Sequence, residues 1–313
     1  MILMKIIDGI LGFAIGDAMG VPIEFCNRED LLNNPVTKMQ GYGQYSVPKG
    51  TWSDDTAMTL ATIDSLTKCP KIDYNDMMKR YCNWINKGMY TVDGVVFDVG
   101  NTTRYALAKY MEGEVPPSKC GLTSINSNGN GSLMRMLPIA YYCYKNNLNE
   151  EQIAFLAKTL SSLTHAHPIS QLGCYLYIMY VIFLLQGYDK KDSYFKLRSI
   201  DLDLFKKDTI NYYSNILEKD ISLFNIDDIK STGYVVDTLE AVLWSILNTS
   251  SYKEAIIVAI NLGDDTDTVG AITGSIAGLI YGSKDIPNTW SSKLRNIDFI
   301  KKLCSKFEAS FNE

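Results

Sequence analysis

The stretch Asn261–Gly270, N-L-G-D-D-T-D-T-V-G, lies between two apolar runs, Ala255–Leu262 and Ala271–Tyr281. The runs have the length and composition of buried helices. Between them, Asp264, Asp265 and Asp267 crowd three carboxylates into four residues. Such a cluster is repulsive unless a positive charge neutralises it. The stretch therefore indicates a bound cation between two core helices.

A second acidic stretch, S-D-D-T at Ser53–Thr56, lies far earlier in the chain. If folding brings the two stretches together, they form an oxygen-lined site for two hard metal ions. Helix capping is the alternative, since Ser53 is a favourable N-cap and the aspartates suit the positive end of a helix. The recurrence of the same chemistry favours one shared site over two separate caps.

The composition of the chain limits what it can be. Its 313 residues, 46% hydrophobic and 21% charged, predict a single globular domain over residues 1–313. A net charge of −5 without basic runs argues against nucleic-acid binding. The two histidines are too few for a three-histidine zinc site, which leaves carboxylates as metal ligands.

The expected location is cytoplasmic. Seven cysteines without a C-x-x-C pair indicate free thiols in a reducing compartment. The N-terminal apolar run contains Asp8 and has no small-residue cleavage site, unlike a signal peptide. The longest apolar run, Cys174–Leu185, is shorter than the roughly 20 residues that cross a bilayer, so no membrane association is expected.

Helical spacing of apolar residues dominates the chain and predicts an all-α fold, because no convincing period-2 strands occur. The first helix is expected over 2–15, ended by Gly16, and residues 188–229 are expected to form short helices and loops. The other expected helices are Thr56–Leu66, Asp76–Asn86, Gly100–Met111, Glu151–Leu163, Ile169–Leu185, Val235–Leu247, Tyr252–Leu262, Val269–Tyr281 and Ile297–Phe311.

Two further acids flank the turn after the first helix. Glu24 stands between Ile23 and Phe25, and a carboxylate with apolar neighbours needs a partner. Asp17 has a simpler interpretation, which stays open: its carboxylate accepts backbone N–H groups. Gly129 and Gly131 in S-N-G-N-G-S allow backbone N–H groups to approach a ligand, or mark a plain surface turn.

Seven motifs then appear in order along nearly the whole chain. They are G-x-x-x-G-D-A-x-G at Gly12–Gly20 with Glu24, W-S-D-D-T at Trp52–Thr56, D-V-G-N-T-T at Asp98–Thr103, G-N-G-S-x-M-R at Gly129–Arg135, S-L-T-H at Ser162–His165, G-Y-V-V-D-T-L at Gly233–Leu239 and G-D-D-T-D-T at Gly263–Thr268. In this combination the chain resembles the ADP-ribosylglycohydrolase family, which includes the dinitrogenase reductase-activating glycohydrolases of bacteria.

The resemblance implies an orthogonal multi-helix bundle around a central cleft that holds two Mg²⁺ or Mn²⁺ ions. It assigns one ion to Ser53, Asp54, Asp55 and Asp267, and the other to Asp55 or Asp265 with Asp267 and Thr268. Ser53 stands where many members have Thr, and Asp264 where many have Gly. The implied substrate is ADP-ribose linked to a side chain, most often arginine or serine, on a protein or in a small-molecule conjugate.

Residue roles follow as expectations. Glu24 and Asp55 are the candidates for handling the proton or water during cleavage of the glycosidic bond. The substrate is expected to contact Gly100, Asn101 and Thr102, with its pyrophosphate on the backbone N–H groups of Asn130, Gly131 and Ser132. His165 is expected to donate to a phosphate or to the ribose; the alternative is a helix cap before Pro168. Arg135 has the alternative of a structural ion pair.

Asp98 bears on which linkage is cleaved. An acid at the cleft mouth could pair with a guanidinium through charge-assisted hydrogen bonds, which favours ADP-ribosyl-arginine over the serine linkage. Helix capping ahead of Gly100 is the alternative role. A family member that binds ADP-ribose without hydrolysing it also stays open. A haloacid-dehalogenase-like phosphatase does not fit, because too little chain follows Asp265 to supply the remaining acids and lysine of that fold.

Overall fold

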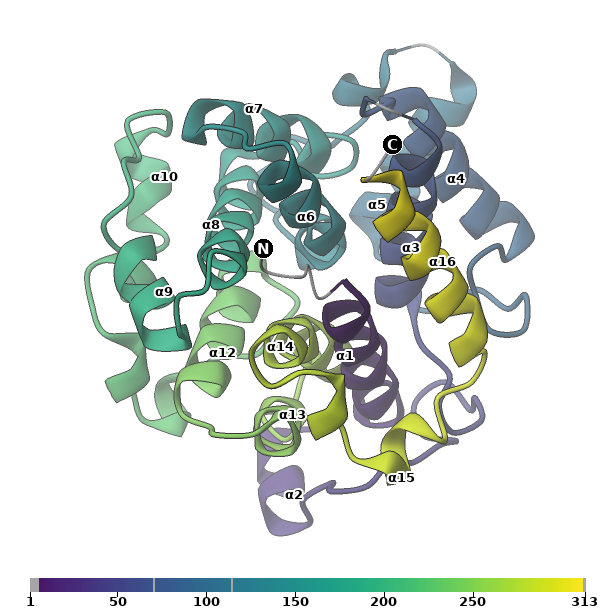
Figure 1. The fold of residues 1–313 in the computed structure, drawn as a ribbon, viewed down its shortest axis with the longest axis vertical. Helices are drawn as coiled ribbons and strands as arrows, with labels where there is room; N and C mark the ends of the chain where they lie inside the picture. The colour runs from purple at the N-terminus through teal and green to yellow at the C-terminus, as the bar shows by residue number, and fades with distance from the viewer. Residues whose placement is uncertain (1–5, 70, 114, 312–313) are drawn as a thin grey trace.

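The structure is a computed structural model that describes residues 6–69, 71–113 and 115–311. Within these ranges it contains helices and no strand, which confirms the all-α prediction (Figure 1). The α-helices are α1 (Ile6–Gly20), α2 (Arg28–Asn33), α3 (Asp54–Lys68), α4 (Tyr74–Lys87), α5 (Asn101–Glu112), α6 (Leu137–Lys145), α7 (Glu150–Ser161), α8 (Pro168–Leu185), α9 (Lys190–Leu197), α10 (Lys207–Asn211), α11 (Ser214–Leu217), α12 (Val235–Leu247), α13 (Tyr252–Ile260), α14 (Thr266–Tyr281), α15 (Asn288–Ser291) and α16 (Ile297–Ser310). Short 3₁₀ helices lie at Val21–Ile23, Pro117–Lys119, Asn130–Arg135, Ile221–Leu223, Ile226–Asp228 and Ser283–Asp285.

Helices α1 and α14 pack side by side at the centre of the molecule (Figure 1). Their backbones approach closely through glycines. A Cβ on Gly16 would lie 2.0 Å from the carbonyl oxygen of Gly270, and one on Gly20 would lie 2.3 Å from that of Thr266. Gly12 meets Gly274 in the same way, at 2.2 Å. Later residues of α1 contact earlier residues of α14, so the two helices run antiparallel.

This contact corrects the prediction that Gly16 ends the first helix. The helix continues to Gly20, because Gly16 is needed as a packing surface against α14 and not as a helix terminator. The predicted start of this helix, in residues 2–5, lies outside the described residues. The helix predicted to begin at Val269 begins at Thr266, so Asp267 lies in its first turn.

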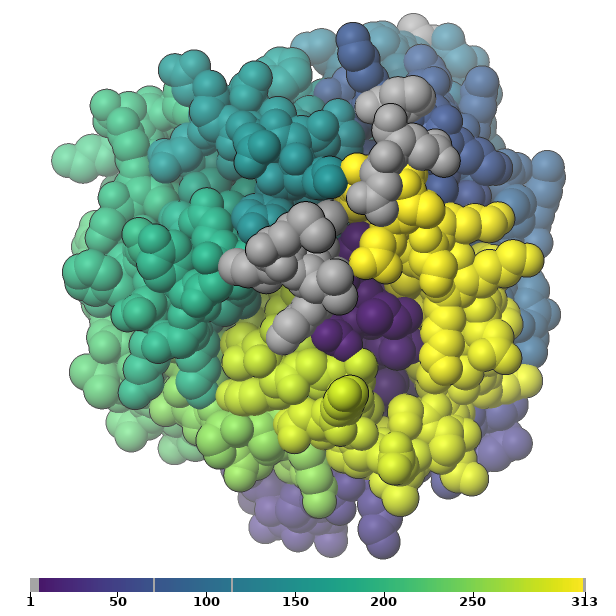
Figure 2. Space-filling view, viewed as in Figure 1, coloured from purple at the N-terminus to yellow at the C-terminus, as the bar shows by residue number. Residues whose placement is uncertain are grey.

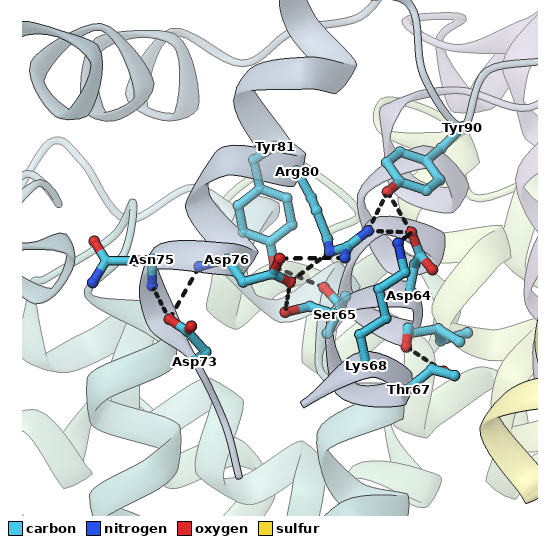
Figure 3. Close-up of polar contacts among 12 residues, drawn as sticks. Asp64, Ser65, Thr67, Lys68, Asp73, Asn75, Asp76, Arg80, Tyr81 and Tyr90 are labelled. Atoms are coloured by element: carbon cyan, nitrogen blue, oxygen red, sulfur yellow. Dashed lines mark hydrogen bonds and ion pairs between the residues drawn. The ribbon is translucent and has the colours of Figure 1, made fainter. Parts of the chain in front are cut away.

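Helix α3 is anchored to α4 by a buried arginine (Figure 3). The guanidinium of Arg80 binds Asp76 at 2.6 Å, binds Asp64, and donates to the hydroxyl of Tyr90 at 3.0 Å. Tyr90 in turn donates to Asp64 at 2.8 Å. Partial burial strengthens these charge-assisted bonds relative to a surface ion pair. They fix the direction of α3, whose first turn carries Asp54 and Asp55.

Two segments of the described chain are long and apolar enough to cross a membrane, Ile6–Ile23 and Pro168–Leu185. The second extends further than the apolar run noted in the sequence. Both are mostly buried inside the protein, by 89% and 78%. In the space-filling view, only a small part of α1 is visible between the C-terminal segments (Figure 2). Burial against other helices accounts for their apolar composition.

The central helix contact predicts a large effect for one methyl group. In Gly16→Ala the new Cβ would overlap the Gly270 carbonyl, and neither backbone can move without displacing its helix. We expect the free energy of unfolding to fall by about 1–3 kcal/mol or more. Chemical denaturation measures this. Gly100→Ala is the control, since a Cβ there meets nothing within 4 Å; equal stability losses in the two variants would contradict the packing argument.

Candidate active site

The two acidic stretches meet at the starts of α3 and α14. The hydroxyl of Thr268 donates to Oδ2 of Asp55 at 3.1 Å, and the hydroxyl of Ser53 donates to the same oxygen at 3.1 Å. The helix starts are also capped by these residues: Ser53 Oγ accepts the N–H of Asp55, and Asp265 accepts that of Thr268. Capping and a shared site are therefore both present in this geometry.

Helix capping does not account for all the carboxylate oxygens at the two helix starts. Oδ1 of Asp55, Oδ2 of Asp267 and Oε2 of Glu24 are buried and have no hydrogen-bond partner among the described residues. Buried acceptors are rarely left unpaired, because each loses its hydration without compensation. Three such carboxylate oxygens in one place indicate a cation as the intended partner.

The carboxylates form two groups that share Asp267. One comprises Asp17, Asp55 and Asp267, the other Glu24, Asp98 and Asp267, and in each group one oxygen per residue lies within 4.8 Å of the others. These groups differ from the ligand sets implied by the resemblance, which contain Asp54 and Asp265 in place of Asp17, Glu24 and Asp98. Oxygen donors clustered on this scale suit Mg²⁺ or Mn²⁺.

Asp17 has the structural role that the sequence left open. Its carboxylate accepts the N–H groups of Ser53 at 2.9 Å and Thr56 at 3.0 Å, and the hydroxyl of Thr56. It thereby ties α1 to the start of α3. Because its oxygens also belong to the first carboxylate group, Asp17 supports the site directly, a role the sequence analysis did not assign to it.

Burial dominates the electrostatics of the cluster. It raises the pKa of Glu24 to about 9, with the charge of Asp98 adding to the effect, and raises the pKa of Asp17 to about 7. The pKa values of Asp55 and Asp267 also lie well above their usual range, through burial first and neighbouring carboxylates second. Without a cation, the folded protein therefore holds protons in this site that the unfolded chain releases at neutral pH.

Glu24 is held beside the α14 start by a strained backbone pair. The N–H of Phe25 donates to the carbonyl of Asp264 at 2.7 Å, and the N–H of Asp264 donates to that of Cys26 at 3.0 Å. Phe25 and Asp264 both have positive φ, 63° and 56°. Aspartate adopts this left-handed conformation more readily than most residues, which explains how Asp264 replaces the glycine common in the family.

Asp98 faces the cluster and does not cap α5. Gly100 is the N-cap of that helix, and no side chain caps it, so the capping alternative for Asp98 is wrong. The hydroxyl of Tyr45 donates to Asp98 at 2.8 Å and lies close to Glu24, while its ring packs on Phe97 with centroids 4.8 Å apart. The sequence analysis missed Tyr45, since it lies in a polar glycine-rich loop without periodicity.

A cleft of about 260 Å³ opens above the acids. Most of the predicted site residues line it: Glu24, Asp54, Asp98, Gly100, Asn101, Thr102, Asn130, Gly131, His165, Asp265 and Thr268. Phe25, Thr103, Gly129, Met134 and Gly233 complete the lining. The cleft wall thus combines loop backbone and small side chains above a floor of carboxylates.

One of the predicted phosphate contacts takes another partner. The hydroxyl of Ser132 points into the core, where it accepts a hydrogen bond from Ser161 at 3.0 Å, while the predicted contact of its backbone N–H stays a prediction. The N–H of Asn130 donates to the carbonyl of Gly233 at 3.0 Å, so it is not available to a phosphate. The Asn130 side chain donates to Asp265 at 2.6 Å instead. Asn130 therefore orients an acid of the site.

His165 is buried beside the cleft and is not a helix cap. The N-cap of α8 is His167, whose Nδ1 accepts the N–H of Ile169 at 3.3 Å, so the capping alternative applies to the neighbouring histidine. His165 Nδ1 lies 2.7 Å from the hydroxyl of Thr164. Burial, reinforced by the charge of Arg135, lowers the pKa of His165 to about 3, which keeps the ring neutral at physiological pH.

The raised carboxyl pKa values predict the pH dependence of stability in EDTA. Because Glu24 and Asp17 are protonated at higher pH in the folded state than in the unfolded chain, stability rises as the pH falls from about 8 to 6. We expect a gain of about 1–3 kcal/mol, measured by denaturant unfolding at each pH. Asp267→Asn, which removes one repelling charge, should flatten the dependence. Stability that increases with pH over this range would contradict the account.

Comparison with known proteins agrees with the geometry. The sequence model of the ADP-ribosylglycohydrolase family matches residues 2–313. The chain is 33% identical over 297 residues to the ADP-ribosylarginine hydrolase Tri1 of Serratia proteamaculans (strain 568), covering 95% of this chain and 77% of that protein. It is 30% identical over 294 residues to the ADP-ribosyl-[dinitrogen reductase] glycohydrolase of Rhodospirillum rubrum, covering 93% and 90%.

A solved structure titled ADP-ribosylglycohydrolase-related protein complex superposes with a TM-score of 0.81 at 27% identity, covering 98% of both chains. Sequence and fold therefore indicate the same family over nearly the whole chain. The chain belongs to the ADP-ribosylglycohydrolase family and is a glycosidase that acts on ADP-ribosylated substrates.

Proposed function

We propose that the protein hydrolyses the glycosidic bond between ADP-ribose and an arginine side chain, in a metal-dependent reaction that reverses mono-ADP-ribosylation. The observation that carries the proposal is a set of three buried, unpartnered carboxylate oxygens, on Glu24, Asp55 and Asp267. Glu24 lines the cleft, while Asp55 and Asp267 lie behind it, next to the lining residues Thr268 and Asp98. Unpaired acceptors in an apolar surrounding are stable only when a cation or a substrate hydroxyl meets them.

The acids and hydroxyls fit two Mg²⁺ or Mn²⁺ ions. We propose Ser53, Asp54, Asp55 and Asp267 as holders of one ion, and Asp267, Thr268 and Asp55 or Asp265 as holders of the other. Asp17, Glu24 and Asp98 supply further oxygens to the same cluster. When bound, such ions act as Lewis acids toward the vicinal ribose hydroxyls and a water molecule.

The remaining catalytic and binding roles are assigned to residues of the chain. Glu24 has an oxygen free to accept a proton from the attacking water, and Asp55 is the second candidate for that role. Gly100, Asn101, Thr102 and Gly131 line the cleft as contacts for the ADP-ribose. The cluster of carboxylates favours the positive charge that develops on the ribose in the transition state.

Arginine is favoured as the leaving side chain because Asp98 lines the cleft next to Glu24. Tyr45 holds one Asp98 oxygen at 2.8 Å, which fixes the carboxylate for a charge-assisted hydrogen bond to a guanidinium. A serine leaving group carries no charge for Asp98 to pair with. The name of the Tri1 relative, an ADP-ribosylarginine hydrolase, supports the same choice.

The cellular setting is part of the proposal. All seven cysteines are free thiols, four of them buried, as expected for a protein of the reducing cytoplasm. We propose an ADP-ribosylated protein or small-molecule conjugate as the partner, with neither nucleic acid nor membrane involved. The net charge of −5 and the lack of basic runs in the sequence support this choice.

The linkage is tested by comparing kcat/KM on arginine-linked and serine-linked ADP-ribosyl peptides with Mg²⁺ or Mn²⁺ present. Wild type should prefer arginine. Asp98→Asn should lower kcat/KM on the arginine substrate by about 10–100-fold, the worth of a hydrogen bond to a charged group, and affect the serine substrate less.

Asp228→Asn is the matched control, since it removes an exposed acid outside the cleft and should leave both rates unchanged. A wild-type preference for serine, or equal losses on both substrates in Asp98→Asn, would reject the arginine assignment. Absence of turnover on every ADP-ribosyl substrate would reject hydrolysis in favour of ADP-ribose binding alone.

A further inference from the structure

Arg135 is a buried cation without a carboxylate partner. Its side chain ends the 3₁₀ helix Asn130–Arg135, is 1% exposed, and forms no ion pair within the described part of the chain. The alternative of a structural ion pair is therefore wrong. Arg80, by contrast, sits between two aspartates (Figure 3). A buried charge that lacks a counter-ion costs free energy, so the groups it binds need an explanation.

The guanidinium of Arg135 joins two segments beside the cleft by hydrogen bonds. Nη1 donates to the carbonyl of Gly131 at 2.9 Å, and Nη2 donates to the hydroxyl of Thr164 at 2.7 Å and to the carbonyl of Leu160 at 3.3 Å. The ring of Tyr81 covers it, with the centroid 5.0 Å from the guanidinium carbon. Gly131 lines the cleft, and Thr164 precedes His165, which also lines it.

The hydrogen bond from Arg135 determines where the hydroxyl proton of Thr164 points. A guanidinium only donates hydrogen bonds, so the Thr164 oxygen must accept from Arg135, which leaves its single proton for another acceptor. The nitrogen Nδ1 of His165 lies 2.7 Å away and is the other hydrogen-bond partner of this hydroxyl among the described residues. Thr164 is fully buried, so a proton pointing elsewhere would be unpaired. Nδ1 is then an acceptor.

A neutral histidine carries one ring proton, and with Nδ1 accepting, that proton is on Nε2. The Nε2 edge borders two glycines: a Cβ on Gly131 would lie 3.5 Å from Nε2, and one on Gly129 would lie 3.6 Å from it. The absence of these side chains leaves the edge open to the cleft. A hydrogen-bond donor of fixed direction thus faces the space where an anionic or hydroxylic ligand would lie.

We propose that Arg135 and Thr164 are positioning residues that hold His165 as the Nε2–H tautomer and so present an N–H donor to a phosphate or ribose oxygen in the cleft. The identity of the ligand rests on the proposed function. The tautomer does not, because it follows from contacts within the chain.

The two histidines of the chain make the tautomer directly measurable. Full-length protein with ¹⁵N-labelled histidine is studied without ligand by long-range ¹H–¹⁵N correlation, which reports which ring nitrogen is protonated. In wild type, His165 should be neutral with the proton on Nε2 between about pH 6 and 8. Thr164→Val, which keeps the shape but removes the hydroxyl, should give mixed tautomers or the Nδ1–H form. Thr164→Ser should keep the wild-type tautomer. Arg135→Met should give a mixture of the Nε2–H and Nδ1–H tautomers.

Two references separate this effect from a general loss of stability. Thr249→Val removes another buried hydroxyl, one that donates to the carbonyl of Ser245 at 2.7 Å, and should leave the His165 signals unchanged. His167 serves as an internal reference in every variant. An Nδ1–H tautomer of His165 in wild type, or an unchanged tautomer in Thr164→Val, would overturn the proposal.

The donor role is tested with ADP-ribose as the probe in calorimetric titrations. Thr164→Val should weaken binding about tenfold, the loss of one well-directed hydrogen bond, and Thr164→Ser should bind like wild type. Equal affinity in wild type and Thr164→Val would overturn the donor role. If wild type does not bind ADP-ribose, the proposed function fails, while the ring-nitrogen measurement still decides the tautomer.

Discussion

The close backbone contact between α1 and α14 is the constraint on which the candidate site depends. Glycines at both surfaces let the helices approach until Cα atoms and carbonyls touch, and the antiparallel direction places the end of α1 at the start of α14. The hydroxyl of Thr266 locks this end by donating to the carbonyl of Gly20 at 2.8 Å. Asp17 and Asp267 are brought together as a result, and Asp17 in turn fixes the start of α3 with Asp55.

The free energy of this arrangement is unfavourable without a cation. Raising the pKa of a carboxyl from 4.5 to about 9, as for Glu24, corresponds to a free-energy penalty on the order of 6 kcal/mol for the charged form. The positive helix starts at α3 and α14 offer about 0.3–1 kcal/mol each, up to about 2 in favourable geometry. Helix dipoles therefore cannot hold the cluster ionised, and a divalent ion is the natural source of the missing positive charge. On the proposed function, the metal-free protein is less stable because its oxygen ligands are already gathered before an ion binds.

The sequence predicted the helical class, and most of the residues that it proposed for the site line one cleft, because both leave local signals. Apolar spacing located α12 with its observed bounds, and the two acidic stretches were recognisable from composition alone. The errors and omissions concern tertiary contacts. Gly16 was predicted to end a helix because its partner, Gly270, lies far away in the sequence. The bond from Tyr45 to Asp98 and the path from Arg135 through Thr164 to His165 join segments that no local pattern connects. The backbone N–H of Asn130 was predicted to contact a phosphate but donates to the carbonyl of Gly233, since a motif does not specify its tertiary partner.

The central claim is that unpaired carboxylate oxygens at the meeting point of α1, α3 and α14 are metal ligands. Anomalous diffraction from crystals grown with Mn²⁺ tests it most directly, because the signal locates the ion independently of the protein coordinates. The account predicts manganese within coordination distance, about 2.0–2.3 Å, of oxygens from both Asp55 and Asp267. Manganese bound only elsewhere on the protein, or an ordered cluster free of metal at saturating Mn²⁺, would contradict it.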